Sequence, residues 1–191
     1  MLNIDSDIVI AVNGCNNAYL DELMWIISQP ATWIPLYVLL LVLLWIKIKD
    51  WRKMLIIIVG FAVAVGLSDI ICSSILKPIV CRLRPTHDPN MPMLHIVHKY
   101  RGGLYGFCSS HAANSMAVAT LFSLLYQKKT VTALLMVWVT VVCYSRIYLG
   151  VHYPTDILAG LAIGSLLAVL TWLVLSIAYR VDVEESQTGD S

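Results

Sequence analysis

The sequence has little charge. Only 13% of its 191 residues are Asp, Glu, Lys or Arg, against roughly 25% in an average soluble domain. A water-soluble domain of this length would need more charged residues to cover its surface, and the charges present gather between apolar runs rather than along helix faces. With 59% hydrophobic residues and a mean hydropathy of +0.77, the composition is that of a membrane protein.

The sequence also lacks a large net charge and a disulfide framework, and we expect no signal peptide. Thirteen basic and twelve acidic residues give a net charge of +1, which indicates no nucleic-acid partner. The five cysteines are an odd number, and most lie in or beside apolar segments as small hydrophobic residues, so a Cys81–Cys108 bond is only a minor alternative. No basic segment precedes a short apolar stretch with a cleavage site. We expect one domain over residues 1–191, and the sequence indicates no oligomeric state.

Apolar runs of about 20 residues, long enough to cross a hydrocarbon layer of roughly 30 Å, define the predicted fold. The predicted spans are 31–48, 54–76, 110–126, 130–149 and 154–179. Residues 1–30 mix acids with apolar residues at helical spacing and predict one or two interfacial helices. The sequence therefore predicts an all-α, integral membrane bundle of five spans plus N-terminal interfacial helices, with a polar tail at 180–191.

Alternating spans sort the connecting segments onto two faces of the membrane. One face carries 47–53, 127–129 and the tail; the other carries the N-terminal segment, 77–109 and 146–153. Lys and Arg divide seven to six, but Lys77, Arg84 and Arg146 on the second face are candidate substrate ligands, which leaves seven to three. The positive-inside tendency then predicts that the first face is cytoplasmic and the second periplasmic or luminal.

Two clusters of reactive residue types lie on this second face. In KPIVCRLRP (77–85), we expect Pro78 to end the second span by forcing Lys77 out of the helical region. In CSSHAANS (108–115), a serine pair opens the third span, with Ser109 or Ser110 as the N-cap. Free N–H groups at this helix start predict an anion site, and His111 lies in the first turn.

A third cluster lies in SRIYLGVHYPTD (145–156). Pro154 suits the first position of the last helix, which leaves His152 just outside and Asp156 at the third position. An acid at that position can reach back and accept an N–H from His152. We expect this contact to fix the tautomer of the ring and to leave the other nitrogen as a nucleophile.

Together these segments offer two histidines, a carboxylate, three cations and a helix N-terminus. This inventory fits phosphoryl transfer, because the transition state spreads charge over the non-bridging oxygens that the protein must position and neutralise. Arginine binds phosphate oxygens in pairs, and lysine adds a point charge.

The three segments resemble the type 2 phosphatidic acid phosphatases, which are related in active-site pattern to vanadium haloperoxidases. The family motifs are lysine, six residues, arginine-proline; proline-serine-glycine-histidine; and serine-arginine, five residues, histidine, three residues, aspartate. The first and third match at every defined position, and the resemblance covers about residues 69–161.

The resemblance implies a role for each matching residue. His152 would attack phosphorus to form a phosphohistidine, Asp156 would orient it, and His111 would protonate the leaving oxygen. The phosphate would be held by Lys77, Arg84, Arg146, Ser109 and Ser110. The implied partners are a lipid phosphate substrate and the bilayer, and no metal or organic cofactor is implied.

The middle motif departs from the family pattern. Cys108 replaces the proline and Ser110 replaces the glycine. If the glycine serves a positive φ or a close approach of its N–H to phosphate, Ser110 would have to tolerate strain or adopt another shape. We expect Ser110 to act only as a backbone N–H donor.

Two further features have open interpretations. Asp69 lies inside the second span and either supports Lys77 or bonds a neighbouring helix. The loop 85–107 alternates apolar and basic residues and suggests a segment that rests among lipid head groups, covers the pocket and reads the head group. A metal site at His87, His95 and His98 is disfavoured, because neither cysteine nor a pattern of ligand-orienting residues accompanies them.

The sequence thus predicts a membrane phosphatase that acts on a lipid head group at the non-cytoplasmic leaflet. We rank a lipid A phosphomonoester and undecaprenyl diphosphate first as substrates, with phosphatidylglycerol phosphate or phosphatidic acid as alternatives. The competing class is a transporter or structural membrane protein, which would place polar residues in the middle of several helices rather than at one face.

Overall fold

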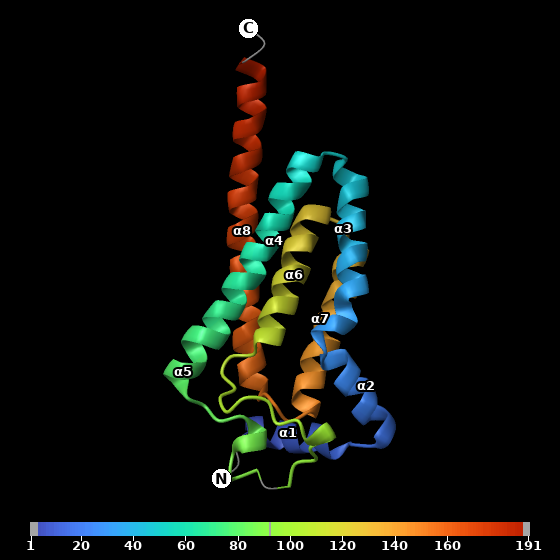
Figure 1. The fold of residues 1–191 in the computed structure, drawn as a ribbon, viewed down its shortest axis with the longest axis vertical. Helices are drawn as coiled ribbons and strands as arrows, with labels where there is room; N and C mark the ends of the chain where they lie inside the picture. Colours follow the sequence, from blue (N-terminus) through green and yellow to red (C-terminus); the bar gives the residue numbers. More distant parts are fainter. Residues whose placement is uncertain (1–3, 92, 189–191) are drawn as a thin grey trace.

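The computed structural model describes residues 4–91 and 93–188, with side chains described up to residue 177. Its helices form a bundle with short helices and loops at one end (Figure 1). They are α1 (Ile4–Gly14), α2 (Ala18–Ser28), α3 (Ile34–Ile48), α4 (Trp51–Asp69), α5 (Lys77–Val80), α6 (Ser110–Tyr126), α7 (Lys129–Tyr148) and α8 (Pro154–Thr188). Within the described ranges β-structure is limited to an isolated bridge between Leu83 and Tyr105, so the all-α prediction is confirmed.

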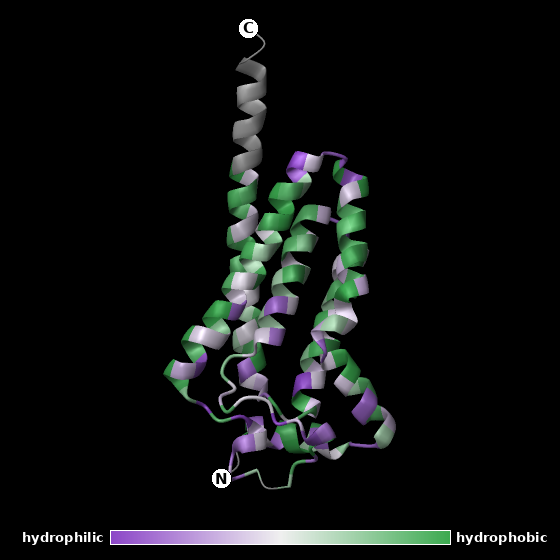
Figure 2. Ribbon diagram, viewed as in Figure 1, coloured by the Kyte–Doolittle hydropathy of each residue, from purple (hydrophilic) through white to green (hydrophobic). Residues whose placement is uncertain are grey.

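Four helical segments are long and apolar enough to cross a membrane. They are Pro30–Ile48, Trp51–Val80, Lys129–Tyr148 and Pro154–Ile177. Figure 2 shows the hydrophobic middle of these helices and the more polar ends of the bundle. The remaining predicted span, 110–126, corresponds to α6, whose 17 residues extend about 26 Å. The integral membrane bundle is confirmed, and the count of five spans stays a prediction.

Helix α6 lies in the centre of the bundle and packs closely on α8 (Figure 1). The close approach depends on Gly160 and Gly164, four residues apart on α8. A Cβ added at Gly160 would lie 2.5 Å from the Ser109 carbonyl oxygen, and one at Gly164 would overlap the Ala113 backbone. Small residues at this spacing let two helix backbones meet. The contact brings the start of α6 beside the start of α8.

The second predicted span continues further than expected. Lys77 has φ −59° and ψ −47°, so it is helical. The helix runs through Pro78 to Val80 before Cys81 ends it in the left-handed region. The prediction that Pro78 forces Lys77 out of the helix is wrong. A π-helical stretch, Ile70–Leu76, ends two residues before Pro78, and such a widened turn accommodates the missing N–H and the ring of proline.

The N-terminal helices and the long loop cover one end of the bundle (Figure 1). Asn13 ties them together, because its side chain donates to the Tyr148 carbonyl at 2.8 Å and accepts from the His95 N–H at 2.8 Å. His95 and His98 pair with Asp21 and Glu22 of α2, at 2.8 and 2.9 Å. These two loop histidines are therefore anchors for the loop.

The two faces predicted from the alternation of spans correspond to the two ends of the bundle. The α3–α4 and α6–α7 turns lie at the end opposite the long loop (Figure 1). The backbone of α8 is helical up to Thr188. The last three residues of the predicted polar tail, 189–191, and its side chains lie outside the described part of the chain.

Candidate active site

His152 lies in the short loop between α7 and α8, with Pro154 at the first position of α8 and Asp156 at the third. The imidazole is 1% exposed. Its Nδ1 lies 3.6 Å from Asp156 Oδ2, longer than a hydrogen bond, and among the described residues Nδ1 has no hydrogen-bond partner. Asp156 Oδ2 instead accepts from the Tyr153 N–H at 3.0 Å. The carboxylate reaches back across the helix start, as expected, but Oδ2 accepts its hydrogen bond from the backbone rather than from His152.

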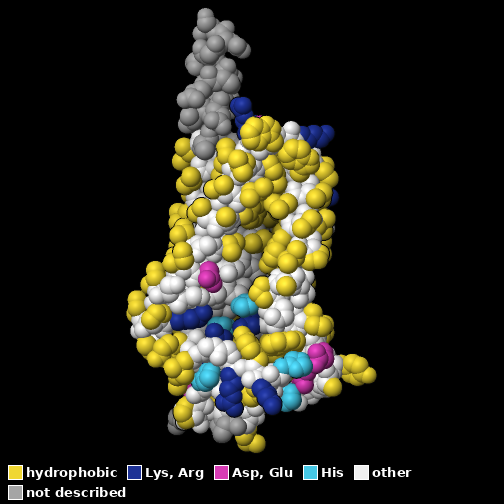
Figure 3. All heavy atoms as spheres, viewed as in Figure 1, with side chains coloured by type: hydrophobic (Ala, Val, Ile, Leu, Met, Phe, Trp, Pro, Cys, Tyr) yellow, Lys and Arg dark blue, Asp and Glu magenta, His cyan; other side chains and the backbone are white. Residues whose placement is uncertain are grey.

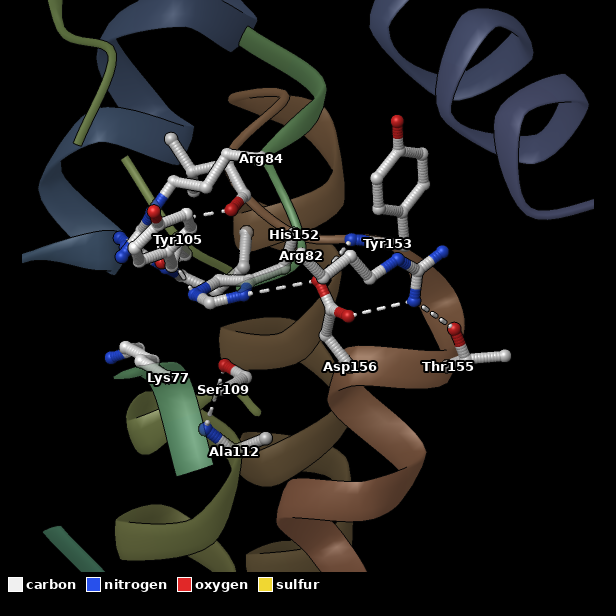
Figure 4. Close-up of polar contacts among 12 residues, drawn as sticks. Lys77, Arg82, Arg84, Tyr105, Ser109, Ala112, His152, Tyr153, Thr155 and Asp156 are labelled. Carbon is white, nitrogen blue, oxygen red and sulfur yellow. Dashed lines mark hydrogen bonds and ion pairs between the residues drawn. The ribbon is translucent and has the colours of Figure 1, made fainter. Parts of the chain in front are cut away.

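The other ring nitrogen faces a cation. His152 Nε2 lies 3.4 Å from Arg84 Nη1, on the side of the ring away from Asp156 (Figure 4). Burial holds the pKa of His152 well below its usual value of 6.5, and Arg84, Arg146 and Lys77 lower it further. Each of these causes disfavours the charged ring. Burial and the neighbouring cations therefore favour the neutral imidazole, which retains a lone pair for attack.

Two arginines are buried beside this ring. Arg84 is 7% exposed and donates to the carbonyls of Tyr105 and Val151, both at 3.2 Å. Burial and the nearby Arg146 lower the pKa of Arg84. Two positive charges that are buried close together cost free energy unless an anion binds between them. The pair is thus suited to bind the oxygens of a phosphate group.

Arg146, at the end of α7, is held by the N-terminal segment and by the long loop. Its Nη1 donates to Ser28 Oγ, and its Nη2 donates to the Tyr100 hydroxyl at 3.5 Å. Arg146 Nε is buried and has no hydrogen-bond partner among the described residues. The guanidinium keeps a donor for a ligand while two separate segments fix its position.

The start of α6 forms the third side of the site. Ser109 is the N-cap, and its side chain accepts from the Ala112 N–H at 3.4 Å. The Ser109 N–H donates to the Asp156 carbonyl at 3.0 Å, which joins the second and third motifs directly. Figure 4 shows Ser109 and Lys77 lying near His152.

Lys77 joins the first motif to the same helix start. Its Nζ donates to Ser110 Oγ at 3.2 Å and to Ser73 Oγ at 3.3 Å. Ser110 is the first residue of α6, and its φ does not lie in the left-handed region. Serine therefore replaces the family glycine without left-handed strain, and its hydroxyl contacts Lys77.

His111 follows in the first turn of α6. Its Nε2 lies 3.2 Å from the Ser28 carbonyl oxygen, so Ser28 contacts both His111 and Arg146. Ser28 is the last residue of α2, and the sequence patterns gave it no role. Ser28 is 83 residues away from His111 in the chain and 118 residues away from Arg146. The local sequence contains no signal for contacts over such separations.

Arg82 is the second residue near the site that the motifs missed. It donates to Asp156 Oδ1 at 2.8 Å and to Asp5 Oδ2 at 2.7 Å, and its guanidinium lies 4.1 Å from the centre of the Tyr153 ring. Figure 4 shows Arg82 between Asp156 and Thr155. Arg82 thus neutralises the fully buried Asp156 from the side away from His152. Arg82 occupies one of the positions in the first motif at which any residue is allowed, so the motif gave no indication of this role.

Gly106 completes the wall around Asp156. A Cβ added there would lie 2.9 Å from Asp156 Oδ2, so only glycine lets the loop backbone approach the carboxylate this closely. The space-filling view shows basic and histidine side chains gathered below the apolar belt (Figure 3). The site combines a neutral imidazole, an acid, a second imidazole and several cations at one end of the spans.

The chain is similar to known proteins. Residues 55–180 match the PAP2 superfamily. The chain is 34% identical to a lipid A 4'-phosphatase from Bacteroides thetaiotaomicron, over 94% of this chain and 79% of that protein. It is 30% identical to an undecaprenyl-diphosphatase from Sulfolobus acidocaldarius, over 84% and 73%.

A solved structure is also similar. It is the crystal structure of a transmembrane PAP2 type phosphatidylglycerolphosphate phosphatase from Bacillus subtilis, with a TM-score of 0.64 and 26% identity, over 87% of this chain and 82% of that one. The likeness of the fold extends well beyond the three motifs.

Proposed function

The chain belongs to the PAP2 superfamily and is a membrane lipid phosphatase, and from this premise we propose its substrate, residue roles and orientation. It removes phosphate from a lipid A phosphomonoester or from undecaprenyl diphosphate through a phosphohistidine at His152. The observation that carries the proposal is the buried His152, whose Nε2 faces Arg84 and whose Nδ1 faces Asp156. The two relatives described above are named for these substrates.

The reaction has two steps. His152 Nε2 attacks phosphorus in line with the leaving oxygen; the new N–P bond forms as the P–O bond breaks. His111 gives a proton to the leaving oxygen. Water then attacks phosphorus, His111 takes its proton, and the N–P bond breaks to release inorganic phosphate.

The cations stabilise the charge of both transition states. Lys77, Arg84 and Arg146 bind the non-bridging oxygens together with the N–H groups at the start of α6, Ser110 among them. Ser109 fixes this helix start through its cap. Asp156 orients His152 and balances the charge that its ring gains during attack. We expect the 3.6 Å separation between His152 and Asp156 to shorten when substrate binds.

The site lies at the non-cytoplasmic face of the membrane. The basis is the Lys and Arg count, seven to three once the three phosphate ligands are set aside. For a bacterial chain this is the periplasmic face of the inner membrane. In the proposed complex, loop 85–107 lies over the bound phosphate and contacts the head group. The hydrogen bond from Arg146 to the hydroxyl of Tyr100 in this loop supports that role.

Phosphate release from purified, reconstituted protein tests this function. The substrates are lipid A, undecaprenyl diphosphate, phosphatidylglycerol phosphate and phosphatidic acid, each at equal surface density. We expect the first or the second to be hydrolysed fastest. Fastest hydrolysis of either of the last two would establish the alternative substrate class. Absence of release from every lipid phosphate would favour the transporter or structural interpretation.

A further inference from the structure

A cavity of about 530 Å³ lies between α3, α4, α6 and α7, on the membrane side of the catalytic residues. Ser110, His111 and Ser28 line the end nearest the site. Neither His152 nor Arg84 is among the described residues that line it. The cavity is therefore reached from the side of His111, not from the side of the nucleophile.

In-line attack decides which part of the substrate enters this cavity. The nucleophile and the leaving oxygen lie on opposite sides of phosphorus. With His152 as the nucleophile and His111 as the proton donor, the leaving oxygen points towards His111. The alcohol that carries the phosphate then extends into the cavity lined by His111.

The first part of the cavity is lined by hydrogen-bonding side chains within the membrane. Asp69 of α4 and Asn114 and Ser115 of α6 line it together with His111. Asn114 Oδ1 is buried and has no hydrogen-bond partner in the described part of the chain. An acidic side chain interrupts the apolar belt in this region (Figure 3), and Asp69 Oδ1 accepts a hydrogen bond from Ser73 at 3.3 Å. Asp69 and Asn114 thus offer acceptor oxygens beside the leaving group.

The remainder of the groove is apolar. Tyr37, Phe61 and Val118 line the deeper part of the cavity and also border a second, apolar space of about 160 Å³. The polar residues of α6 in the cavity lie between Ser110 and Ser115, a separation of five helical steps or about 7.5 Å along the helix. A bound lipid thus meets a polar zone next to the phosphate and acyl-chain surroundings beyond it.

We propose that Asp69 and Asn114 are specificity-determining residues that accept hydrogen bonds from hydroxyl or amide N–H groups of the leaving alcohol. The preferred substrate is therefore a phosphomonoester on an acylated head group rich in hydroxyls and amides, such as an acylated amino sugar. This inference rests on the proposed phosphatase reaction. It favours a lipid A phosphomonoester over undecaprenyl diphosphate, two substrates between which the motifs do not discriminate.

A diphosphate fits this zone poorly. Its leaving group is itself an anionic phosphate, which would enter beside the Asp69 carboxylate, and like charges repel more strongly away from bulk water. A polyprenyl chain offers no donor, so the acceptors would be left unpaired. Sites built to hydrogen-bond a substrate discriminate strongly against analogues that lack those groups.

The test compares two substrates in proteoliposomes: lipid A and undecaprenyl diphosphate. Asp69→Leu and Asn114→Leu remove the acceptors, and Asp69→Asn keeps the shape and one acceptor while removing the charge. Asp7→Asn, an exposed carboxylate of α1, is the control with the same change of charge. The measured quantity is the ratio of kcat/KM for lipid A to that for the diphosphate.

We expect the ratio to fall by about ten- to a hundredfold in Asp69→Leu, because hydrogen bonds to charged groups are about twice as strong as neutral ones. Asn114→Leu should lower it less, and Asp69→Asn should lower it mainly by raising hydrolysis of the diphosphate. The Asp7→Asn ratio should equal that of the wild type. An unchanged ratio in every Asp69 variant overturns the proposal.

A second pattern overturns the proposal for a different reason. Equal loss for both substrates in the Asp69 variants would mean that Asp69 acts only through Ser73 on Lys77. Hydrolysis of neither lipid by the wild type would instead contradict the proposed function on which the inference rests. Asp69→Asn keeps the assay informative if Asp69→Leu does not fold.

Discussion

Arg82→Ala should impair catalysis although Arg82 lies away from the phosphate ligands. Asp156 is fully buried and pairs with Arg82 at 2.8 Å. Removal of one partner of a fully buried pair costs roughly 3–5 kcal/mol. The Arg82 side chain is 27% exposed, so water can partly replace it, and we expect a loss of stability of about 1–3 kcal/mol.

The effect on rate follows from the orientation of Asp156. Without Arg82, the carboxylate is free to rotate away from His152 Nδ1, which already lies 3.6 Å from Asp156. Loss of a partner that orients a functional side chain typically costs about ten- to a hundredfold. The loss should appear in kcat with little change in KM, because Arg82 positions the acid and does not bind phosphate.

Two variants provide matched controls for Arg82→Ala. Arg82→Lys supplies one ammonium that cannot hold Asp5 and Asp156 together, so it should restore part of kcat. Asp5→Asn leaves the Arg82–Asp156 pair intact and should have a smaller effect. The assay is the initial rate of phosphate release, with the melting temperature in detergent as a check of folding. Wild-type kcat in folded Arg82→Ala would refute the positioning role.

Three further predictions test other parts of the structure. The low pKa of His152 should keep kcat/KM from falling until well below pH 6.5, and Arg84→Gln, by removing a neighbouring cation, should raise that pKa and shift the acid limb to higher pH; superimposable acid limbs would contradict this. Gly106→Ala should lower kcat by about tenfold, since its Cβ would meet the Asp156 carboxylate; an unchanged kcat would mean that the loop shifts freely. Gly164→Leu should lower the melting temperature by separating α6 from α8, whereas wild-type stability would show that this contact is dispensable.

Much of the arrangement could be predicted from the sequence, because its causes are local. Hydropathy predicted the apolar helices, and α6 has the bounds expected from its serine cap. Pro154 placed His152 and Asp156 at the start of α8. Motif spacing indicated which helix ends carry the candidate site residues, but it did not predict the contacts between those helix ends.

The remaining features depend on contacts between distant parts of the chain. Pro78 is a helix breaker by local rules, yet the preceding π-helical turn accommodates it. Arg82 gained its role from Asp5, 77 residues away, and Ser28 gained its role from His111 and Arg146. Sequence periodicity contains no signal for such pairs.

His152 is the proposed nucleophile, and a phosphoenzyme experiment tests this role directly. Purified wild-type protein mixed briefly with a radiolabelled lipid phosphate and quenched in base should retain label as phosphohistidine, and peptide mapping should place the label on His152. His152→Ala should retain no label and release no phosphate. Label on any other residue, or phosphate release by folded His152→Ala at the wild-type rate, would contradict the account.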